Sequence, residues 1–412
     1  MKKKILLKGP LLTRSGYGEQ SRFVLRSLRS REDLFDIYIQ PLQWGKTSWI
    51  NEATEERLWI DAIIEKTIAY AQQGGKFDIS VQSTIPNEFQ NLATFNIGYT
   101  AGIETSKVSH QWIQKSNEMD KLIVVSSHSK NIFQNTEYQA QNTQTGQEIT
   151  LKMEKPVEFV NYPTKTFDNL PELELELSTE FNFLSVAQFG PRKNLQNTLK
   201  WFIEEFRNED VGLVLKTNIA KNCLLDRRQL HNDLTAYLRQ MGERQCKVYL
   251  LHGDMTDEEM HSLYVSPKIQ ALLALPHGEG FGLPIFEAAY SHLPVIATGW
   301  SGQLDFLVDE AGKDQFYNVA FDLQPVQKEV HWEGVIIPES MWAYPRETSA
   351  KEQMRLCYED LKNGVTRWDN SGINERFSKD KMYKKFVDEI LGFDSSLIKI
   401  EEKQEAEVLE FE

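Results

Sequence analysis

The sequence predicts an α/β protein built from two similar halves, each with a parallel β-sheet covered by helices. Short apolar runs alternate with amphipathic stretches along most of the chain, and this alternation is typical of β-α-β units. The chain has 412 residues, which is enough for about two or three domains. Two prolines and several polar residues within 162–178 separate the two series of apolar runs and indicate an interdomain linker.

The expected strands follow one another in chain order. In the first half they cover residues 4–7, 35–39, 79–82, 95–99, 122–126 and 158–161, and in the second half 181–187, 212–216, 247–251, 271–274 and 295–297. Helix-like stretches include 18–28, 55–72 and 380–391. Residues 136–154 are rich in Gln, Asn and Thr, so we expect a loop or a hairpin there.

The composition is that of a globular protein with excess negative charge. Hydrophobic residues make up 41% and charged residues 26%, which excludes wholesale disorder. Lys and Arg number 46 and Asp and Glu 60, giving a net charge of −14. The overall negative charge therefore does not attract the chain to nucleic acid or to an anionic membrane. A local basic cleft is still compatible with this composition.

Cysteine content and hydropathy indicate in which cellular compartment the protein works. Cys223, Cys246 and Cys357 are odd in number and form no CxxC pair, so we expect neither a disulfide framework nor a zinc site. No window approaches the roughly 20 apolar residues that span a bilayer. We therefore expect a cytoplasmic protein with no integral membrane segment.

The most informative stretch is HGEGFGLPIFE, residues 277–287. Its three glycines follow the apolar run 271–275, and Pro284 suits the first turn of a helix. The stretch thus predicts a strand, a glycine-rich loop and a helix start, which together bring backbone N–H groups close to an anion. We expect the carboxylates of Glu279 and Glu287 to face one crevice. An ordinary strand–loop–helix turn would explain the glycines but not both acids.

The spacing of Glu279 and Glu287 within GEGFGLPIFE resembles the signature of retaining glycosyltransferases of the GT-B architecture, in particular family 4 (glycosyl transferases group 1). TGWSGQLD, at 298–305, fits the same family. The resemblance implies two Rossmann-like domains facing each other across a cleft. It covers most of residues 1–310 and becomes weak over 313–374.

The resemblance also implies a domain division. Residues 1–165 would form the acceptor-side domain, and 175–375 would bind the nucleotide sugar. A helix at about 378–398 would cross back to the first domain, and 399–412 would be an acidic tail.

The resemblance assigns roles within the HGEGFGLPIFE stretch. Glu279 would be catalytic and hold the transferred sugar, while Glu287 would bind the donor ribose. The remaining donor-binding residues of the stretch would be Gly280, Phe281, Gly282 and Leu283.

A second stretch, FLSVAQFGPRKN at 183–194, resembles the basic loop that holds the donor pyrophosphate in this family. Arg192 and Lys193, with Lys216 at the end of the run 212–216, are the expected cations for the diphosphate leaving group. The family often has Arg where this chain has Gln188. Without the motif, Lys193 would be interpreted as a solvated surface lysine.

Two loops of the first half complete the expected site. Gly16 and Gly18 in TRSGYGEQSR resemble the glycine-rich loop that closes on the donor. Glu104 in GYTAGIETSKVSH is the second catalytic candidate, and a solvated loop glutamate is the alternative. Ser126 and Ser127 follow the next strand and could cap the helix after it.

The resemblance implies a retaining transfer from a nucleotide-sugar donor to an acceptor hydroxyl, by a front-face mechanism without a covalent enzyme intermediate. No D-x-D occurs in the sequence, so we expect neither a metal nor any other cofactor. Arg, Lys and helix dipoles would replace magnesium.

The expected acceptor is a bacterial glycan, with two alternatives. GPLLTRSGYGEQSR together with HGEGFGLPIFEAAY also resembles glycosyltransferases of tailed phages, some of which modify hydroxymethylated bases in DNA. Such an enzyme would work in the host cytoplasm and would flip its target base. A basic groove would support it, built from residues 2–4, Lys8, Arg14, Arg22, Arg26 and Arg29. The other alternative is a nucleotide-sugar-binding module without turnover.

Overall fold

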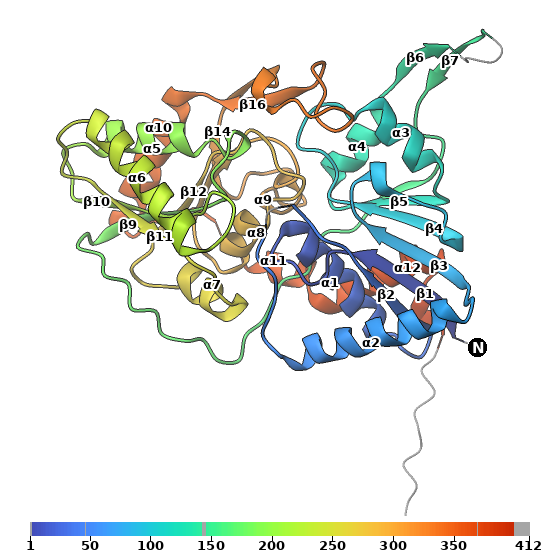
Figure 1. Cartoon of the computed structure of the whole chain (residues 1–412). Coiled ribbons are helices and arrows are strands. Elements are labelled where there is room, and N and C mark those ends of the chain that lie inside the picture. The colour runs from blue at the N-terminus through green and yellow to red at the C-terminus, as the bar shows by residue number, and fades with distance from the viewer. Residues whose placement is uncertain (1, 46, 142–145, 369, 399–412) are drawn as a thin grey trace, which may run out of the picture.

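The structure, a computed structural model, describes residues 2–45, 47–141, 146–368 and 370–398. Its two largest sheets have six strands each, in the orders β2-β1-β3-β4-β5-β8 and β11-β10-β9-β12-β13-β14. All neighbouring strands in these two sheets run parallel. The sheets lie in two lobes that face each other (Figure 1). The α/β fold class predicted from the sequence is therefore confirmed.

The first lobe is a sheet with helices on both sides. Its strands are β1 (Lys3–Gly9), β2 (Phe35–Pro41), β3 (Phe77–Ser83), β4 (Ala93–Thr100), β5 (Lys121–Val124) and β8 (Val157–Phe159), and its helices are α1 (Gly16–Arg29), α2 (Glu55–Gln72), 3₁₀-helix η1 (Pro86–Glu88), α3 (His110–Asn117) and α4 (Ser127–Asn135). Ile5 and Leu7 in β1 are fully buried, as expected for a parallel strand that is covered on both faces. The side chains of Ser15, Thr54 and Ser109 accept backbone N–H groups and fix the starts of α1, α2 and α3.

The second lobe repeats this plan. Its strands are β9 (Phe181–Val186), β10 (Val211–Lys216), β11 (Lys247–Leu251), β12 (Ala271–Ala274), β13 (Val295–Thr298) and β14 (Tyr317–Val319), and its helices are η2 (Pro191–Lys193), α5 (Leu195–Phe206), α6 (Leu224–Gln240), α7 (Asp257–Tyr264), α8 (Leu283–Tyr290), α9 (Leu304–Leu307) and α10 (Glu347–Lys362). Helix α5 packs Phe202 and Phe206 against Phe183 of β9. The apolar stripe of this helix thus covers one face of the sheet.

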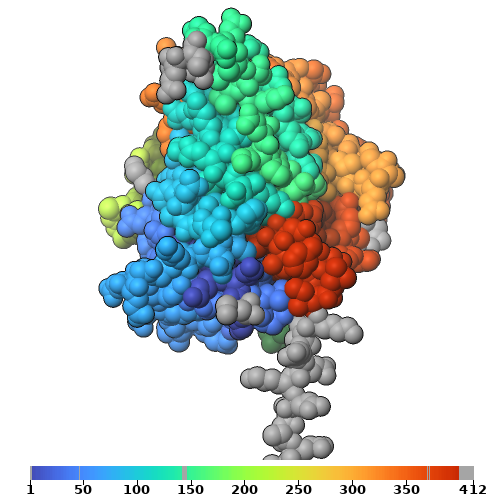
Figure 2. Space-filling model, turned by 90° about the vertical axis from the view of Figure 1, so that its right-hand side faces the viewer, coloured from blue at the N-terminus to red at the C-terminus, as the bar shows by residue number. Residues whose placement is uncertain are grey.

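The chain passes twice between the lobes. Residues 160–180 contain no helix or strand and lead from β8 to β9. Helices α11 (Ser371–Arg376) and α12 (Lys379–Leu391) return to the first lobe, where the Phe386 ring packs 5.3 Å from that of Phe23 and 5.0 Å from that of Tyr99. Figure 2 shows this red C-terminal segment against the blue and cyan parts of the first lobe. After η4 (Ser395–Leu397), the expected acidic tail at 399–412 lies outside the described residues.

A second bridge comes from the stretch where the sequence resemblance is weak. Strands β15 (Phe321–Pro325) and β16 (Met341–Pro345) pair antiparallel, and the segment between them reaches the first lobe (Figure 1). The Ser106 N–H donates to the carbonyl of Met341 at 3.0 Å, and the Met341 N–H donates to Ser106 Oγ at 2.9 Å. The Ser109 hydroxyl donates to the carbonyl of Gly334 at 2.7 Å. Hydrogen bonds therefore join the two lobes at this end of the interface.

The Gln-, Asn- and Thr-rich stretch forms an antiparallel hairpin of β6 (Tyr138–Gln141) and β7 (Glu148–Leu151), which projects from the first lobe (Figure 1). Within the described ranges, no helix combines the length and the apolar character needed to cross a bilayer.

Candidate functional site

The glycine-rich loop between β12 and α8 lies directly against the first lobe. A Cβ on Gly278 would come within 2.2 Å of the backbone oxygen of Glu104, and a Cβ on Gly280 within 2.4 Å of that of Ala101. Gly282 has a φ of +93° where the chain turns into α8, a conformation that disfavours a side chain. Glycine is therefore needed at the first two positions for the close approach of the lobes and at the third for the turn.

Glu279 lies between two cations. Lys193 Nζ donates to its Oε1 at 2.5 Å, and Arg192 Nη1 donates to its Oε2 at 2.9 Å. Nη2 of Arg192 is 3.5 Å from the Glu104 carboxylate of the first lobe. Glu279 is only 7% exposed. Four of the residues predicted from sequence, contributed by both lobes, thus form one ion-pair network.

The network keeps the Glu279 carboxylate ionised. Burial alone would raise the pKa of Glu279, but the charges of Lys193 and Arg192 outweigh burial and hold that pKa below its usual range. Burial lowers the pKa of Lys193, against the attraction of Glu279. The site therefore holds a buried carboxylate whose charge is balanced by cations suited to binding a second anion.

The backbone of Glu279 is fixed by the loop after β13. Its N–H donates to Ser301 Oγ at 2.9 Å, and the Ser301 hydroxyl donates to Gln303 Oε1 at 2.8 Å. Ser301 has a φ of +80°, which is unusual for a residue other than glycine. Sequence reasoning did not single out Ser301 or Gln303. The sequence feature that points to this loop is the stretch TGWSGQLD, which resembles the family but assigns no role to either residue.

The other predicted residues of the HGEGFGLPIFE stretch offer backbone groups to a ligand, and one of them also packs its side chain into the core. The Phe281 ring is 3% exposed and packs against Tyr162, Phe286 and Phe306. Its side chain therefore belongs to the core, and only its backbone can serve a ligand. Helix α8, which begins at Leu283, has no side chain capping its N-terminus, so its first N–H groups suit an anion.

Lys216 lies apart from the cluster. Its ammonium group donates to the carbonyl of Gly253, and burial lowers its pKa. Among the contacts of the described residues, it has none with Arg192 or Lys193. Its predicted place beside the pyrophosphate stays a prediction.

Glu287 has partners of its own. The Tyr264 hydroxyl donates to its Oε2 at 3.1 Å. Burial raises the pKa of Glu287 to about 7, against the attraction of Lys165. The Lys165 ammonium lies 2.9 Å from both Glu19 and Asp257, and so joins α1 to α7. Sequence reasoning missed Lys165, Asp257 and Tyr264. The single crevice expected for both motif glutamates is not supported by a shared contact.

The loop after β1 places Gly16 and Gly18 at the start of α1. The Gly18 N–H donates to Ser15 Oγ at 2.9 Å, and a Cβ on Gly18 would come within 2.1 Å of the Thr13 carbonyl oxygen. A Cβ on Gly16 would meet no protein atom within 4 Å. Gly18 is therefore required by packing, whereas Gly16 leaves open space at the surface.

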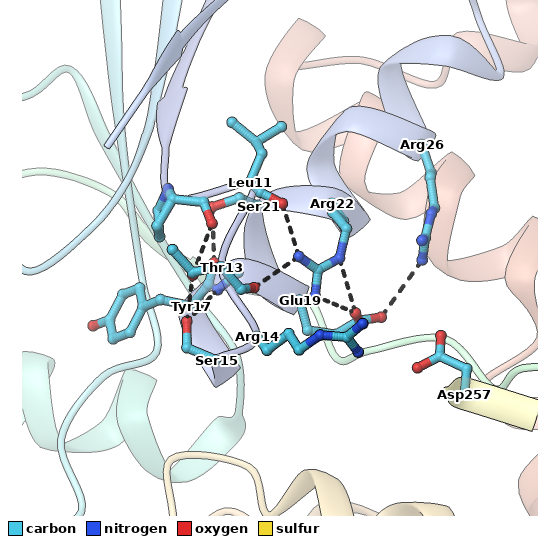
Figure 3. Close-up of polar contacts among 12 residues, drawn as sticks. Leu11, Thr13, Arg14, Ser15, Tyr17, Glu19, Ser21, Arg22, Arg26 and Asp257 are labelled. Carbon is cyan, nitrogen blue, oxygen red and sulfur yellow. Dashed lines mark hydrogen bonds and ion pairs between the residues drawn. The ribbon is translucent and has the colours of Figure 1, made fainter. Parts of the chain in front are cut away.

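The arginines of the basic groove that would support a DNA acceptor have acidic partners. Figure 3 shows Arg22 and Arg26 directed at the carboxylate of Glu19. Each arginine of the proposed groove is paired with a glutamate: Arg14 with Glu52, Arg22 with Glu19, Arg26 with Glu56 and Glu19, and Arg29 with Glu55. The four arginine charges are thus balanced by neighbouring acids, and the DNA acceptor stays a prediction.

Two further expectations concern helix α4 and metals. Ser126 Oγ accepts the Ser129 N–H and caps α4, as expected from the sequence, whereas Ser127 is the first residue of the helix. Within the described ranges, no three His, Cys, Asp or Glu side chains gather as a set of metal ligands. A reaction without metal stays a prediction.

No protein-family model matches the sequence. The chain is 32% identical over 130 residues to the serotype-specific mannosyltransferase WbdA of Escherichia coli, a match that covers 31% of this chain and 15% of that protein. The chain thus matches less than a sixth of the length of this relative.

Solved structures match the whole fold at low identity. HepE of Anabaena, in complex with UDP and glucose, has a TM-score of 0.57 at 14% identity over 95% of this chain and 100% of its own. The apo lipopolysaccharide outer core galactosyltransferase WaaB has a TM-score of 0.54 at 13% identity over 95% and 99%. With the two parallel sheets, these matches confirm the GT-B fold and the expected likeness to glycosyltransferases of that fold.

Proposed function

We propose that this chain is a retaining glycosyltransferase that moves a sugar from a nucleotide-sugar donor to an acceptor hydroxyl. The observation that carries the proposal is the ion-pair network of Glu279 with Arg192, Lys193 and Glu104. It places a carboxylate, a pair of cations and a glycine-rich helix start together where the two lobes meet. An acid for the sugar and cations for its leaving group are what glycosyl transfer from a diphosphate requires.

In this proposal, residues 175–375 bind the donor. Its diphosphate would lie against Arg192 and Lys193 and accept hydrogen bonds from the N–H groups at the start of α8, from Gly282 and Leu283. The backbone of Gly280 and Phe281 would line the same loop. Lys216 would add positive charge from the end of β10, and Glu287 would accept the ribose hydroxyls.

Residues 1–165, with the returning helix within about 378–398, would form the acceptor side. Gly16 and Gly18 would close over the donor, because Gly16 leaves open space there. Glu104 would act beside the reacting sugar, since it already touches Arg192 across the interface.

The proposed chemistry is a front-face displacement. As the glycosidic bond breaks, negative charge grows on the diphosphate, and Arg192, Lys193 and the α8 N-terminus stabilise it. The departing phosphate oxygen takes the proton of the acceptor hydroxyl, and Glu279 holds the oxocarbenium-like sugar. No metal is needed, because fixed cations balance the leaving group. Closed lobes exclude the water that would otherwise hydrolyse the donor.

A bacterial glycan is the favoured acceptor. The relatives named above are a serotype-specific mannosyltransferase and a lipopolysaccharide galactosyltransferase. The pairing of Arg14 and of the α1 arginines with glutamates favours a glycan over modified DNA, which would need unpaired positive charge. A module that binds the donor without turnover is the remaining alternative.

A screen of nucleotide sugars tests the proposal. We expect at least one donor to release its nucleoside diphosphate on incubation with the full chain. The product should keep the donor's anomeric configuration, as read by NMR. Binding of a nucleoside diphosphate without sugar release from any donor would leave only the binding module. Inversion at the anomeric carbon would contradict the retaining mechanism.

A further inference from the structure

An aromatic pair lies on the first lobe beside the candidate site. The rings of Trp44 and Tyr17 lie with their centroids 4.1 Å apart. Tyr17 Oη lies 2.8 Å from Thr100 Oγ1 and accepts the Ala101 N–H at 3.3 Å. The Ala101 carbonyl is the group against which Gly280 packs. Two contacts of Ala101, one with Tyr17 and one with Gly280, therefore connect the aromatic pair to the loop that carries Glu279.

The loop that carries Trp44 is tied to the loop after β1. The Leu42 N–H donates to the Gly9 carbonyl at 2.9 Å, and the Arg14 N–H donates to the Ser48 carbonyl at 2.8 Å. Trp44 itself is partly exposed. A large aromatic surface thus lies beside the loop after β1 and is left partly uncovered, although packing it inside would be favourable.

The surroundings of this pair are acidic. Glu88 is exposed, and the Glu104 side chain is 28% exposed. The Thr84 hydroxyl donates to the Glu88 carboxylate at 2.5 Å, and the Thr84 N–H donates to the Tyr99 carbonyl at 3.1 Å, one residue before the Thr100 that contacts Tyr17. Figure 3 shows Tyr17 directed away from Arg22 and Arg26. The ammonium of Lys8 is buried and donates to the Glu88 carbonyl and to Gln90.

The donor and acceptor must approach Glu279 from different sides. The diphosphate cations and the start of α8 belong to the second lobe, and the glycine-rich loop is pressed against Ala101 and Glu104 of the first. An incoming hydroxyl must therefore arrive along the first lobe, where the Trp44–Tyr17 pair lies. This step rests on the proposed function.

We propose that Trp44 and Tyr17 form the acceptor subsite and that it takes an uncharged sugar residue. The C–H face of a sugar packs on the partly exposed indole, while its hydroxyls donate to the carboxylates of Glu88 and Glu104. A phosphate-bearing acceptor, including a nucleic acid, is repelled by the carboxylate of Glu88, since Glu104 is already paired with Arg192. The subsite therefore selects a neutral glycan over modified DNA.

Kinetics on the full chain, with the donor found by the screen, test the subsite. The probes are methyl α-mannoside, methyl α-glucoside and methyl β-galactoside as neutral acceptors, and mannose 6-phosphate and a hydroxymethylcytosine oligonucleotide as anionic ones. We expect transfer to a neutral glycoside and none to the anionic probes. Trp44→Ala should raise the acceptor KM at least about tenfold, with kcat and donor hydrolysis without acceptor little changed. Trp44→Phe, which keeps an aromatic face, should recover most of the affinity.

Trp332→Ala is the matched control, because it removes an indole that is 57% exposed on the segment between β15 and β16. Its acceptor KM should equal that of the wild type. The subsite is wrong if Trp44→Ala leaves the acceptor KM unchanged, if both tryptophan variants raise it equally, or if the oligonucleotide is the better acceptor. In those cases donor hydrolysis still stands, and with it the proposed function. If no donor is cleaved, the proposed function fails and the subsite fails with it.

Discussion

The carboxylate of Asp305 accepts hydrogen bonds from both the backbone N–H and the hydroxyl of Ser127, the first residue of α4. The N–H bond is 2.9 Å long, and Asn161 Nδ2 donates to the same carboxylate at 2.7 Å. An acid of the second lobe thus sits at the N-terminus of a helix of the first, where the helix dipole favours it. This contact helps to hold the lobes in the closed arrangement that brings Glu104 to Arg192.

Asp305→Ala should loosen this interface. Loss of the charged acceptor leaves the Ser127 N–H and the Asn161 amide without their partner, which should cost about 1–3 kcal/mol of unfolding free energy. Urea unfolding measures the cost, and small-angle scattering should show a larger particle that contracts when nucleoside diphosphate is added. Exposed Glu310→Ala is the control and should change neither. Unchanged dimensions and stability in Asp305→Ala would show that other contacts set the closure.

Lys193→Ala should weaken binding of the nucleoside diphosphate by more than about tenfold, because one charge-assisted contact contributes roughly 1.5–3 kcal/mol. Isothermal calorimetry on the full chain measures the change. Lys200→Ala removes a nearby lysine of α5 whose side chain is 43% exposed, and should bind like the wild type. Equal affinities of the wild type, Lys193→Ala and Lys200→Ala for the nucleoside diphosphate would show that Lys193 does not bind the donor.

Glu287 should make stability fall as pH rises. The pKa of this carboxyl is about 7 in the folded chain, raised chiefly by burial from its usual 4.5. Between these values the folded state binds more protons than the unfolded state, so unfolding free energy decreases from about pH 4.5 to about pH 7. The loss should reach at most about 3 kcal/mol.

Urea midpoints between pH 5 and pH 8 measure this dependence. Glu287→Gln cannot titrate and should show a flatter profile, whereas exposed Glu258→Gln should follow the wild type. Parallel profiles for the wild type and Glu287→Gln would contradict the raised pKa.

The reaction should survive a chelator. Arg192, Lys193 and the α8 N-terminus supply the positive charge that magnesium supplies in other transferases, so EDTA should leave the rate of donor cleavage within about twofold. Rates measured with EDTA, and again after adding magnesium or manganese, check this. Abolition by EDTA with recovery on adding metal would contradict the proposed mechanism.

Much of the fold and part of the candidate site could be predicted from the sequence. The strand–loop–helix pattern of HGEGFGLPIFE is local, so the apolar run before it, the glycines and Pro284 predicted the turn into α8 and its uncapped N–H groups. Arg192 and Lys193 could be matched to Glu279 although they are 86 and more residues away, because each lies in a recognisable motif. The ring of Phe281, a residue of the same motif, packs into the core, so its predicted part in donor binding is left to its backbone.

Other features depend on tertiary contacts that no local pattern reveals. Lys165, in a stretch expected only as a linker, pairs with acids of both lobes. Ser301 has a φ of +80°, and its hydroxyl is held by the Glu279 N–H and by Gln303. The segment between β15 and β16, which joins the two lobes, lies where the sequence resemblance to the family is weak, so no motif predicted this contact. Such residues become visible only when the two lobes are placed together.

The most direct test of the account compares Glu279→Gln with the wild type in two measurements on one preparation, donor turnover and nucleoside diphosphate affinity. Glu279 now neutralises Arg192 and Lys193 at 2.9 and 2.5 Å, so it competes with the diphosphate for them while serving the transferred sugar. We expect Glu279→Gln to lower kcat at least about a hundredfold and at the same time to bind the diphosphate several-fold more tightly. Unchanged turnover, or weaker diphosphate binding in the variant, would contradict it.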